Sequence, residues 1–261
     1  MSEPLVKIHV HQKTATILLN RPDKRNALNR AMLAELDQAL HDLHMQRSAR
    51  AVILSGAGSS FCAGMDLVEM QATAAAADAI RLWEQDARAY REVIEKMLRF
   101  PKPIIAAVDG AAVAGGAGLV LASDMVVASQ NANFGLPEPR RGLIAGMVAP
   151  LLHFRIGAGR AAYLLLTAET IGAERACEMG IFHEVVQSDV VWARANQLAE
   201  ACTASAPEAL ALTKRLLNET IGDHLVTMLA AGTAASSTAR TTAAAAEGLA
   251  AFVEKREPNW E

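Results

Sequence analysis

Residues 104–124 read IIAAVDGAAVAGGAGLVLASD, and this stretch decides the fold of the chain. It begins with an apolar run, Ile104 to Val108, whose length suits a buried β-strand. Four glycines, the last of them Gly118, then interrupt the apolar pattern before it resumes. A strand that runs into a glycine-rich turn and a helix leaves backbone N–H groups unpaired, and a ligand can approach them closely. Such a turn can hold an anion, either a permanent one or one that develops during a reaction. The alternative is that the small residues only allow tight packing.

The composition limits the class of protein. A chain of 261 residues can form one large domain or two smaller ones, and 52% hydrophobic residues argue against wholesale disorder. The net charge of −3 gives no reason to expect nucleic acid or an anionic membrane as partner. Cys62, Cys177 and Cys202 are too few and too scattered for a disulfide framework, which favours a cytoplasmic location. We expect no signal peptide, no membrane span and no metal site, because nothing near His9 and His11 completes a ligand set.

The periodicity predicts strands and helices in the first half of the chain and almost only helices after Leu151. The expected strands are a hairpin of 8–10 with 14–19, then 51–55, 104–108 and 125–128. The expected early helices are 32–43, capped by Asn29, and a long helix that ends before Pro101. The expected late helices are 160–166, 173–179, 190–206, 207–220 and 243–255. The alanine tract 72–77 is expected to be a mobile edge.

Two further glycine-containing stretches follow the strand at 51–55. Residues 56–58, Gly-Ala-Gly, with Asp78 downstream, suggest a dinucleotide site, but Phe61 stands where that motif has glycine or alanine. Residues 62–66, Cys-Ala-Gly-Met-Asp, form a second small-residue turn that could present another free N–H group. We therefore consider a dinucleotide-dependent oxidoreductase only as a remote possibility.

One carboxylate is placed unusually. Glu138 lies between Pro137 and Pro139 in an otherwise apolar stretch, and the two prolines fix the backbone around it. This arrangement suits a group that must be aimed at a substrate. The alternative is a structural ion pair with Arg140 or Arg141.

Taken together, these segments resemble the crotonase, or enoyl-CoA hydratase/isomerase, family over essentially the whole chain. The motifs that carry the resemblance are LNRPDKRNALN (19–29), SGAGSSFCAGMDL (55–67), KPIIAAVDGAAVAGGAGLVLASDMVVAS (102–129), FGLPEPRRGL (134–143) and EGLAAFVEKREPNW (247–260). The resemblance implies an α/β fold, a spiral of ββα units over residues 1–200, and a C-terminal helical region, 201–261, for oligomerisation. It also implies an acyl-CoA thioester as substrate, with coenzyme A as part of that substrate and no other cofactor. The expected assembly is a homotrimer or a dimer of trimers.

The resemblance also implies the site. The backbone N–H groups of Met65 and Gly115 would form an oxyanion hole for the thioester carbonyl, and Glu138 would be the acid/base. The residues expected to contact the CoA or the substrate are Lys24, Arg25, Ala27, Ala63, Gly64, Asp66, Leu67, Gly116, Phe252 and Lys255. The stretch from Met70 to Tyr90 is expected to line the acyl pocket.

The chain departs from the family pattern at Gly118, where hydratases of this family typically carry a second glutamate. Two enzymatic interpretations remain. Either Glu138 alone hydrates a 2-enoyl-CoA, with branched substrates such as 3-methylglutaconyl-CoA in view, or it shuttles a proton between C2 and C4 of a 3-enoyl-CoA as an isomerase. We prefer the hydratase. The alternative of another class is a catalytically silent CoA-binding protein, against which the presence of Glu138 argues.

Overall fold

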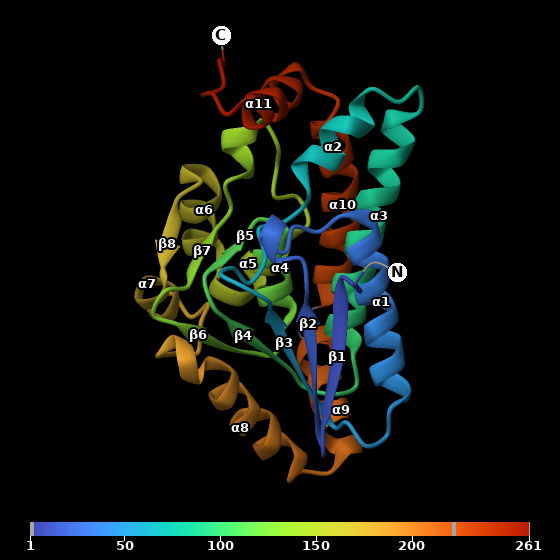
Figure 1. Cartoon of the computed structure of the whole chain (residues 1–261), viewed down its shortest axis with the longest axis vertical. Helices are drawn as coiled ribbons and strands as arrows, with labels where there is room; N and C mark the ends of the chain where they lie inside the picture. Colours follow the sequence, from blue (N-terminus) through green and yellow to red (C-terminus); the bar gives the residue numbers. More distant parts are fainter. Residues whose placement is uncertain (1–2, 221–222, 261) are drawn as a thin grey trace.

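The computed structural model of the chain describes residues 3–220 and 223–260 as an α/β structure built on two β-sheets (Figure 1). The larger sheet has six strands, in the order β1-β2-β3-β4-β6-β9. These strands are β1 (Val6–His11), β2 (Thr14–Leu19), β3 (Ala51–Gly56), β4 (Ile104–Val108), β6 (Met125–Ser129) and β9 (Glu184–Val186). β1 and β2 form the predicted antiparallel hairpin, and each later pairing in this sheet is parallel.

The smaller sheet is formed by β5 (Ala111–Val113), β7 (Asn133–Gly135) and β8 (Thr170–Gly172). β5 follows β4 and leads into α4 (Gly115–Ala122), whereas β7 follows β6 and leads toward α5 (Val148–Ile156) and α6 (Ala158–Thr167). In each of these two units, the chain forms one strand of the larger sheet and one strand of the smaller sheet, and then continues into a helix. This is the predicted spiral of ββα units.

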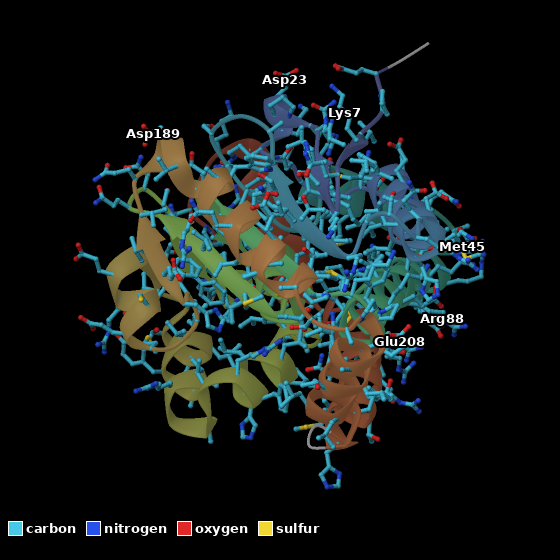
Figure 2. The ribbon with its side chains drawn as sticks, turned by 90° about the horizontal axis from the view of Figure 1, so that it is seen from below. Lys7, Asp23, Met45, Arg88, Asp189 and Glu208 are labelled. Carbon is cyan, nitrogen blue, oxygen red and sulfur yellow. The ribbon has the colours of Figure 1, made fainter. Side chains whose placement is uncertain are left out.

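Different helices cover the two faces of the larger sheet. Neighbouring side chains on a strand point to opposite faces, so Ile53 of β3 faces α8 (Val191–Thr203) while Val52 and Leu54 face the main core. The small side chains of α8, with Ala195 at their centre, allow the helix to lie close against the strands (Figure 2).

The other face of the sheet is covered by α1 (Arg30–Met45) and α3 (Ala79–Arg99), which also pack against each other. The predicted cap of α1 is confirmed, because the Asn29 side chain accepts a hydrogen bond of 2.9 Å from the Met32 amide. Figure 2 shows Lys7, Asp23 and Asp189 pointing outward from the periphery.

The expectation for the alanine tract at 72–77 was wrong in part. Its first residues complete α2 (Leu67–Ala74), which is capped by Asp66, and Thr73 within that helix is buried. Alanine has the highest helix propensity, so the tract continues a helix once a cap has started it. β8 and β9 lie in the part expected to be almost only helical, and these two short strands gave no recognisable alternation, whereas α7 (Ala173–Glu178) confirms the helix expected at 173–179.

The C-terminal region consists of α9 (Pro207–Arg215), the π-helical turn η4 (Leu216–Thr220), α10 (Asp223–Ala239) and α11 (Ala243–Glu254). α10 was not predicted from the sequence. It packs against α3 and α5, and α11 packs against α2, at the top of Figure 1. The last helices therefore return to the elements that follow the glycine-rich turns. Among the described residues, no helix has the length and apolar character needed to cross a membrane.

Candidate active site

The two small-residue turns identified in the sequence lie against each other. The Cys62 amide donates a hydrogen bond of 2.9 Å to the Ala111 carbonyl, and the Val113 amide donates one of 3.1 Å to the Cys62 carbonyl. These bonds join the segment that precedes α2 to strand β5, which precedes α4. Met65 and Gly115, the two predicted donors, are thereby held at the starts of two neighbouring helices.

Gly64 shows how close this contact is. A Cβ at this position would lie 2.7 Å from the Ala114 Cβ and 3.0 Å from the Gly115 nitrogen. The φ angle of Gly64 is +86°, a conformation that residues with a side chain rarely adopt. Glycine is therefore required here, both for its backbone conformation and to leave the Gly115 amide uncovered.

Ala114 is the one non-glycine residue of this turn with strained backbone geometry. Its φ of +51° and ψ of −124° lie outside the regions favoured by L-residues. Its amide donates to the Gly135 carbonyl at 2.9 Å, which holds the turn to β7. Such strain is typical of functional sites that are held by the surrounding structure.

The Met65 and Gly115 amides donate no hydrogen bond to a backbone carbonyl within the described residues. For Gly115 the reason is its position as the first residue of α4, where helical amides have no partner in the helix. Both residues line the same cavity, of about 310 Å³. Two residues whose amides make no backbone hydrogen bond in the described structure thus line a single cavity from separate segments.

Glu138 opens the short turn η2 (Glu138–Arg141) and lines that cavity as well. Its Oε2 atom is buried and has no hydrogen-bond partner among the described residues. Burial raises the pKa of Glu138 to about 7, with only a small opposing effect from its own backbone amide. The alternative of an ion pair with Arg140 or Arg141 is not observed in the described structure, where the Arg141 guanidinium instead lies 5.3 Å from the centre of the Phe252 ring.

The space beside Gly118 is filled by a tyrosine. A Cβ at Gly118 would lie 1.9 Å from the Tyr90 Oη atom and 3.2 Å from its Cζ atom. The Tyr90 hydroxyl donates a hydrogen bond of 2.6 Å to the Gly115 carbonyl, and the side chain is buried. Burial, with smaller effects from Cys62 and Glu138, raises the pKa of Tyr90 above its ordinary value. A second carboxylate at Gly118 is therefore excluded sterically.

Most of the predicted contact residues line the cavity. These are Lys24, Arg25, Ala27, Ala63, Asp66, Leu67 and Phe252, together with Met65, Gly115 and Glu138. Met70 and Tyr90 also line it, at the two ends of the stretch expected to form the acyl pocket.

Three predicted contact residues do not line the cavity: Gly64, Gly116 and Lys255. Gly64 acts as the spacer described above. A Cβ at Gly116 would lie 2.2 Å from the Cys62 carbonyl oxygen, so this glycine serves the contact between the turns. Lys255 ends α11 in a left-handed conformation and is exposed.

Asp66 is the second acidic residue in the cavity wall, but its carboxylate is occupied. It accepts a hydrogen bond of 2.6 Å from Arg21 and caps α2 through the Val68 and Glu69 amides. Burial alone would raise the pKa of Asp66, but these bonds outweigh it and the pKa lies below the ordinary value. Asp66 is thus held as a carboxylate, whereas Glu138 can change protonation near neutral pH.

Several cavity residues were not assigned to the site from the sequence, among them Arg141, Ser236 and Arg240. Arg141 follows Glu138 in the quoted motif, and its nearness to that residue was a usable signal. Ser236 and Arg240 come from the region of α10, which has no local pattern that points to the site. In the described structure, no group of His, Cys, Asp and Glu side chains could hold a metal ion, and Asp78 is paired with Arg81.

The profile of the enoyl-CoA hydratase/isomerase family matches residues 9–261. The 2,3-dehydroadipyl-CoA hydratase of Escherichia coli is 34% identical, covering 100% of this chain and 99% of the relative. The 1,2-epoxyphenylacetyl-CoA isomerase of Escherichia coli is 33% identical, covering 97% and 96%. A crystal structure of an enoyl-CoA hydratase/isomerase from Xanthobacter autotrophicus Py2 superimposes with a TM-score of 0.87 at 32% identity, covering 97% of this chain and 93% of the other. The chain belongs to the enoyl-CoA hydratase/isomerase family and has the crotonase fold.

Proposed function

We propose that the protein is an enoyl-CoA hydratase, which adds water across the 2-enoyl double bond of an acyl-CoA thioester. The observation that carries this proposal is Glu138, whose buried Oε2 atom has no hydrogen-bond partner in the described structure and whose pKa is about 7, in the cavity that Met65 and Gly115 also line. A general acid/base works best when its pKa lies near the working pH. The similarity to the Escherichia coli protein named as a 2,3-dehydroadipyl-CoA hydratase also supports hydratase activity.

In the proposed reaction the thioester oxygen accepts hydrogen bonds from the Met65 and Gly115 amides. The Glu138 carboxylate takes a proton from a water molecule whose oxygen forms a bond to C3. The C2–C3 π electrons move toward the thioester oxygen, and Glu138 then returns the proton to C2. Negative charge develops on the thioester oxygen, and each preorganised donor lowers the barrier by about 3–4 kcal/mol.

A single carboxyl group suffices for this cycle because the same proton is taken and returned. The space that a second glutamate would need is occupied by Tyr90. The Tyr90 hydroxyl donates its proton to the Gly115 carbonyl, so its oxygen keeps lone pairs that can accept a hydrogen bond from the attacking water. Tyr90 is thus our candidate for holding this water.

We further propose how the rest of the substrate binds. Lys24 and Arg25 are the candidates for the CoA phosphates, and Ala27, Ala63 and Leu67 for the adenine and pantetheine path. Phe252, on the C-terminal helix, is a further candidate for contact with the CoA. Lys255 would contact the CoA that is bound to a neighbouring subunit. These assignments presuppose a homotrimer or a dimer of trimers, which the mass of the protein in solution will test.

The alternative activity is isomerisation of a 3-enoyl-CoA to a 2-enoyl-CoA. One observation favours it: Glu138 is the one cavity carboxyl group among the described residues without a partner, and one base suffices to move a proton between C2 and C4. A relative is also named as an isomerase, the 1,2-epoxyphenylacetyl-CoA isomerase of Escherichia coli.

The deciding experiment is product analysis on 2-enoyl-CoA and 3-enoyl-CoA substrates of varied length and branching. Hydratase activity predicts loss of the conjugated-enoyl absorbance and a 3-hydroxyacyl-CoA product. Glu138→Gln should lower kcat by about 10²- to 10⁴-fold while CoA still binds. Glu208→Gln, on the exposed start of α9, is the matched control and should keep full activity.

Three results would contradict the proposal. Conversion of 3-enoyl-CoA to 2-enoyl-CoA without any 3-hydroxy product would establish the isomerase instead. Binding of acyl-CoA without turnover of any substrate would establish a silent CoA-binding protein. Unchanged turnover in Glu138→Gln would remove Glu138 from the mechanism.

A further inference from the structure

A buried cation lines the cavity at a place that the proposed mechanism does not use. Arg240 directly follows α10, and only 6% of its surface is exposed. Its Nη1 atom donates a hydrogen bond of 3.2 Å to the Trp83 carbonyl. Within the described structure this is the one hydrogen bond that its guanidinium makes. The remaining donors of Arg240 are therefore available to a molecule in the cavity.

Arg240 makes no direct ion pair with a carboxylate in the described structure. The nearest carboxylate, Asp86, is already bound by Arg30 through two hydrogen bonds, of 2.6 and 2.9 Å. Arg240 therefore shares Asp86 with Arg30, whose charge Glu69 also faces, and makes no direct ion pair of its own in the described structure. Burial lowers the pKa of Arg240 to about 10, and Asp86 offsets only part of this effect, so Arg240 remains protonated at neutral pH. A buried charge without a direct ion-pair partner is costly, and a bound anion would relieve that cost.

Ser236 lies one helical turn before Arg240 and lines the same cavity. Its side chain is buried, and its hydroxyl makes no hydrogen bond to any other described residue. A hydroxyl and a guanidinium four residues apart, both lining the cavity, provide two donors for the two oxygens of a carboxylate.

Much of the lining of the same cavity is apolar. It includes Met70, Leu143, Ala145, Met147 and Val148. An apolar wall with one buried cation fits a hydrocarbon chain that ends in an anion, because methylene groups cover the wall and the anion pairs with the cation.

We propose that Arg240 and Ser236 bind a carboxylate at the end of the acyl chain remote from the thioester. The preferred substrates are then 2-enoyl-CoA thioesters of dicarboxylic acids. This inference rests on the proposed function, since it names the substrate class of the same cavity. Arg240 acts as a specificity-determining residue and takes no part in proton transfer.

The experiment compares pairs of 2-enoyl-CoA substrates of equal length that end either in a carboxylate or in a methyl group. The wild-type protein should show the higher kcat/KM for the carboxylate member at the length that reaches Arg240. Arg240→Met should lower the ratio of carboxylate to methyl kcat/KM by about 10- to 100-fold, the usual effect of losing a hydrogen bond to a charged group. Ser236→Ala should lower the same ratio by about 3- to 10-fold.

Arg155→Met is the matched control. Arg155 is also a partly buried arginine that donates to backbone carbonyls, those of Leu121 and Ser123, but it does not line the cavity. Its loss should leave the substrate ratio unchanged. If Arg240→Met fails to fold, Ser236→Ala and Arg240→Lys test the same ratio.

A binding measurement separates this inference from the proposed function. Adipoyl-CoA and hexanoyl-CoA have no double bond to hydrate, and their dissociation constants can be measured by calorimetry. The inference predicts tighter binding of adipoyl-CoA than of hexanoyl-CoA, with the difference lost in Arg240→Met, whether or not hydration occurs. Tighter binding of hexanoyl-CoA, or an equal loss of affinity for free CoA in Arg240→Met, would overturn it. Absence of turnover with every enoyl-CoA would overturn only the hydratase.

Discussion

The contact between Gly118 and Tyr90 allows a quantitative prediction through a double-mutant cycle. In Gly118→Ala the new Cβ would lie 1.9 Å from the Tyr90 Oη atom, so the hydroxyl must move away and lose its 2.6 Å hydrogen bond to the Gly115 carbonyl. Overpacking costs about 1–3 kcal/mol, and the lost hydrogen bond costs about 0.5–1.5 kcal/mol. Replacing glycine by alanine within a helix stabilises the folded state by about 0.5–1 kcal/mol. We expect a net loss of about 1–3 kcal/mol in the free energy of unfolding.

Tyr90→Phe removes the obstructing oxygen and should itself cost about 1 kcal/mol. In that background the nearest ring atom to the new Cβ is Cζ, at 3.2 Å, so Gly118→Ala should be close to neutral. The coupling free energy between the two substitutions is then about 2 kcal/mol, within the range known for residues in contact. Urea unfolding of the wild type, the two single variants and the double variant, all at the same protein concentration, measures this coupling free energy.

The control is Gly159→Ala, also within a helix, where a Cβ would meet nothing within 4 Å. This variant should be as stable as the wild type or slightly more stable. Equal costs of Gly118→Ala with tyrosine and with phenylalanine at position 90 would refute the reasoning, because the hydroxyl would then not be what excludes a side chain.

Three further predictions concern the site. The kcat/KM for hydration should rise with pH through a midpoint near 7, because Glu138 must be a carboxylate to accept a proton; a flat profile between pH 5 and 9 would contradict this. The raised pKa of Glu138 should also make the stability of the protein pH-dependent. The folded state binds this proton more tightly than the unfolded state, whose carboxyl has a pKa of 4.5, so the contribution is full below pH 4.5 and is lost as pH rises through 7. The free energy of unfolding of Glu138→Gln should therefore be about 3 kcal/mol higher than that of the wild type at pH 8, with a smaller difference at pH 5. A difference that does not depend on pH would contradict this prediction. Gly64→Ala should lower kcat at least tenfold by covering the Gly115 amide and should also destabilise the fold, whereas Gly172→Ala, which has open space, serves as control.

The parts of the fold that carry a repeating pattern could be predicted from the sequence. The β1–β2 hairpin, α1 with its Asn29 cap and the long helix α3 have strong local periodicity, and the buried strand β4 is a continuous apolar run that ends at a glycine turn. β8 and β9 have three residues each, too few to show alternation. α10 is rich in alanine, serine and threonine, and its position is fixed by packing against α3 and α5.

The candidate site could be predicted only where its residues belong to recognisable motifs. Glu138 and the two glycine-rich turns stand out in the sequence because prolines and glycines restrict or free the backbone there. The meaning of Gly118 could not be predicted, because the tyrosine that requires glycine comes from α3, far earlier in the chain. Arg240 was missed for the same reason: its burial and its shared carboxylate depend on Arg30 and Asp86 from other elements.

The cavity takes part of its wall from each end of the chain, with Lys24 beyond β2 and Phe252 on α11. A bound thioester therefore acts as a noncovalent cross-link between the first and last segments of the fold. Because the ligand binds only when both ends are in place, a hundredfold excess over its dissociation constant adds about 2.7 kcal/mol against unfolding. Saturating acyl-CoA is therefore expected to slow proteolysis that depends on unfolding of the first or last segment.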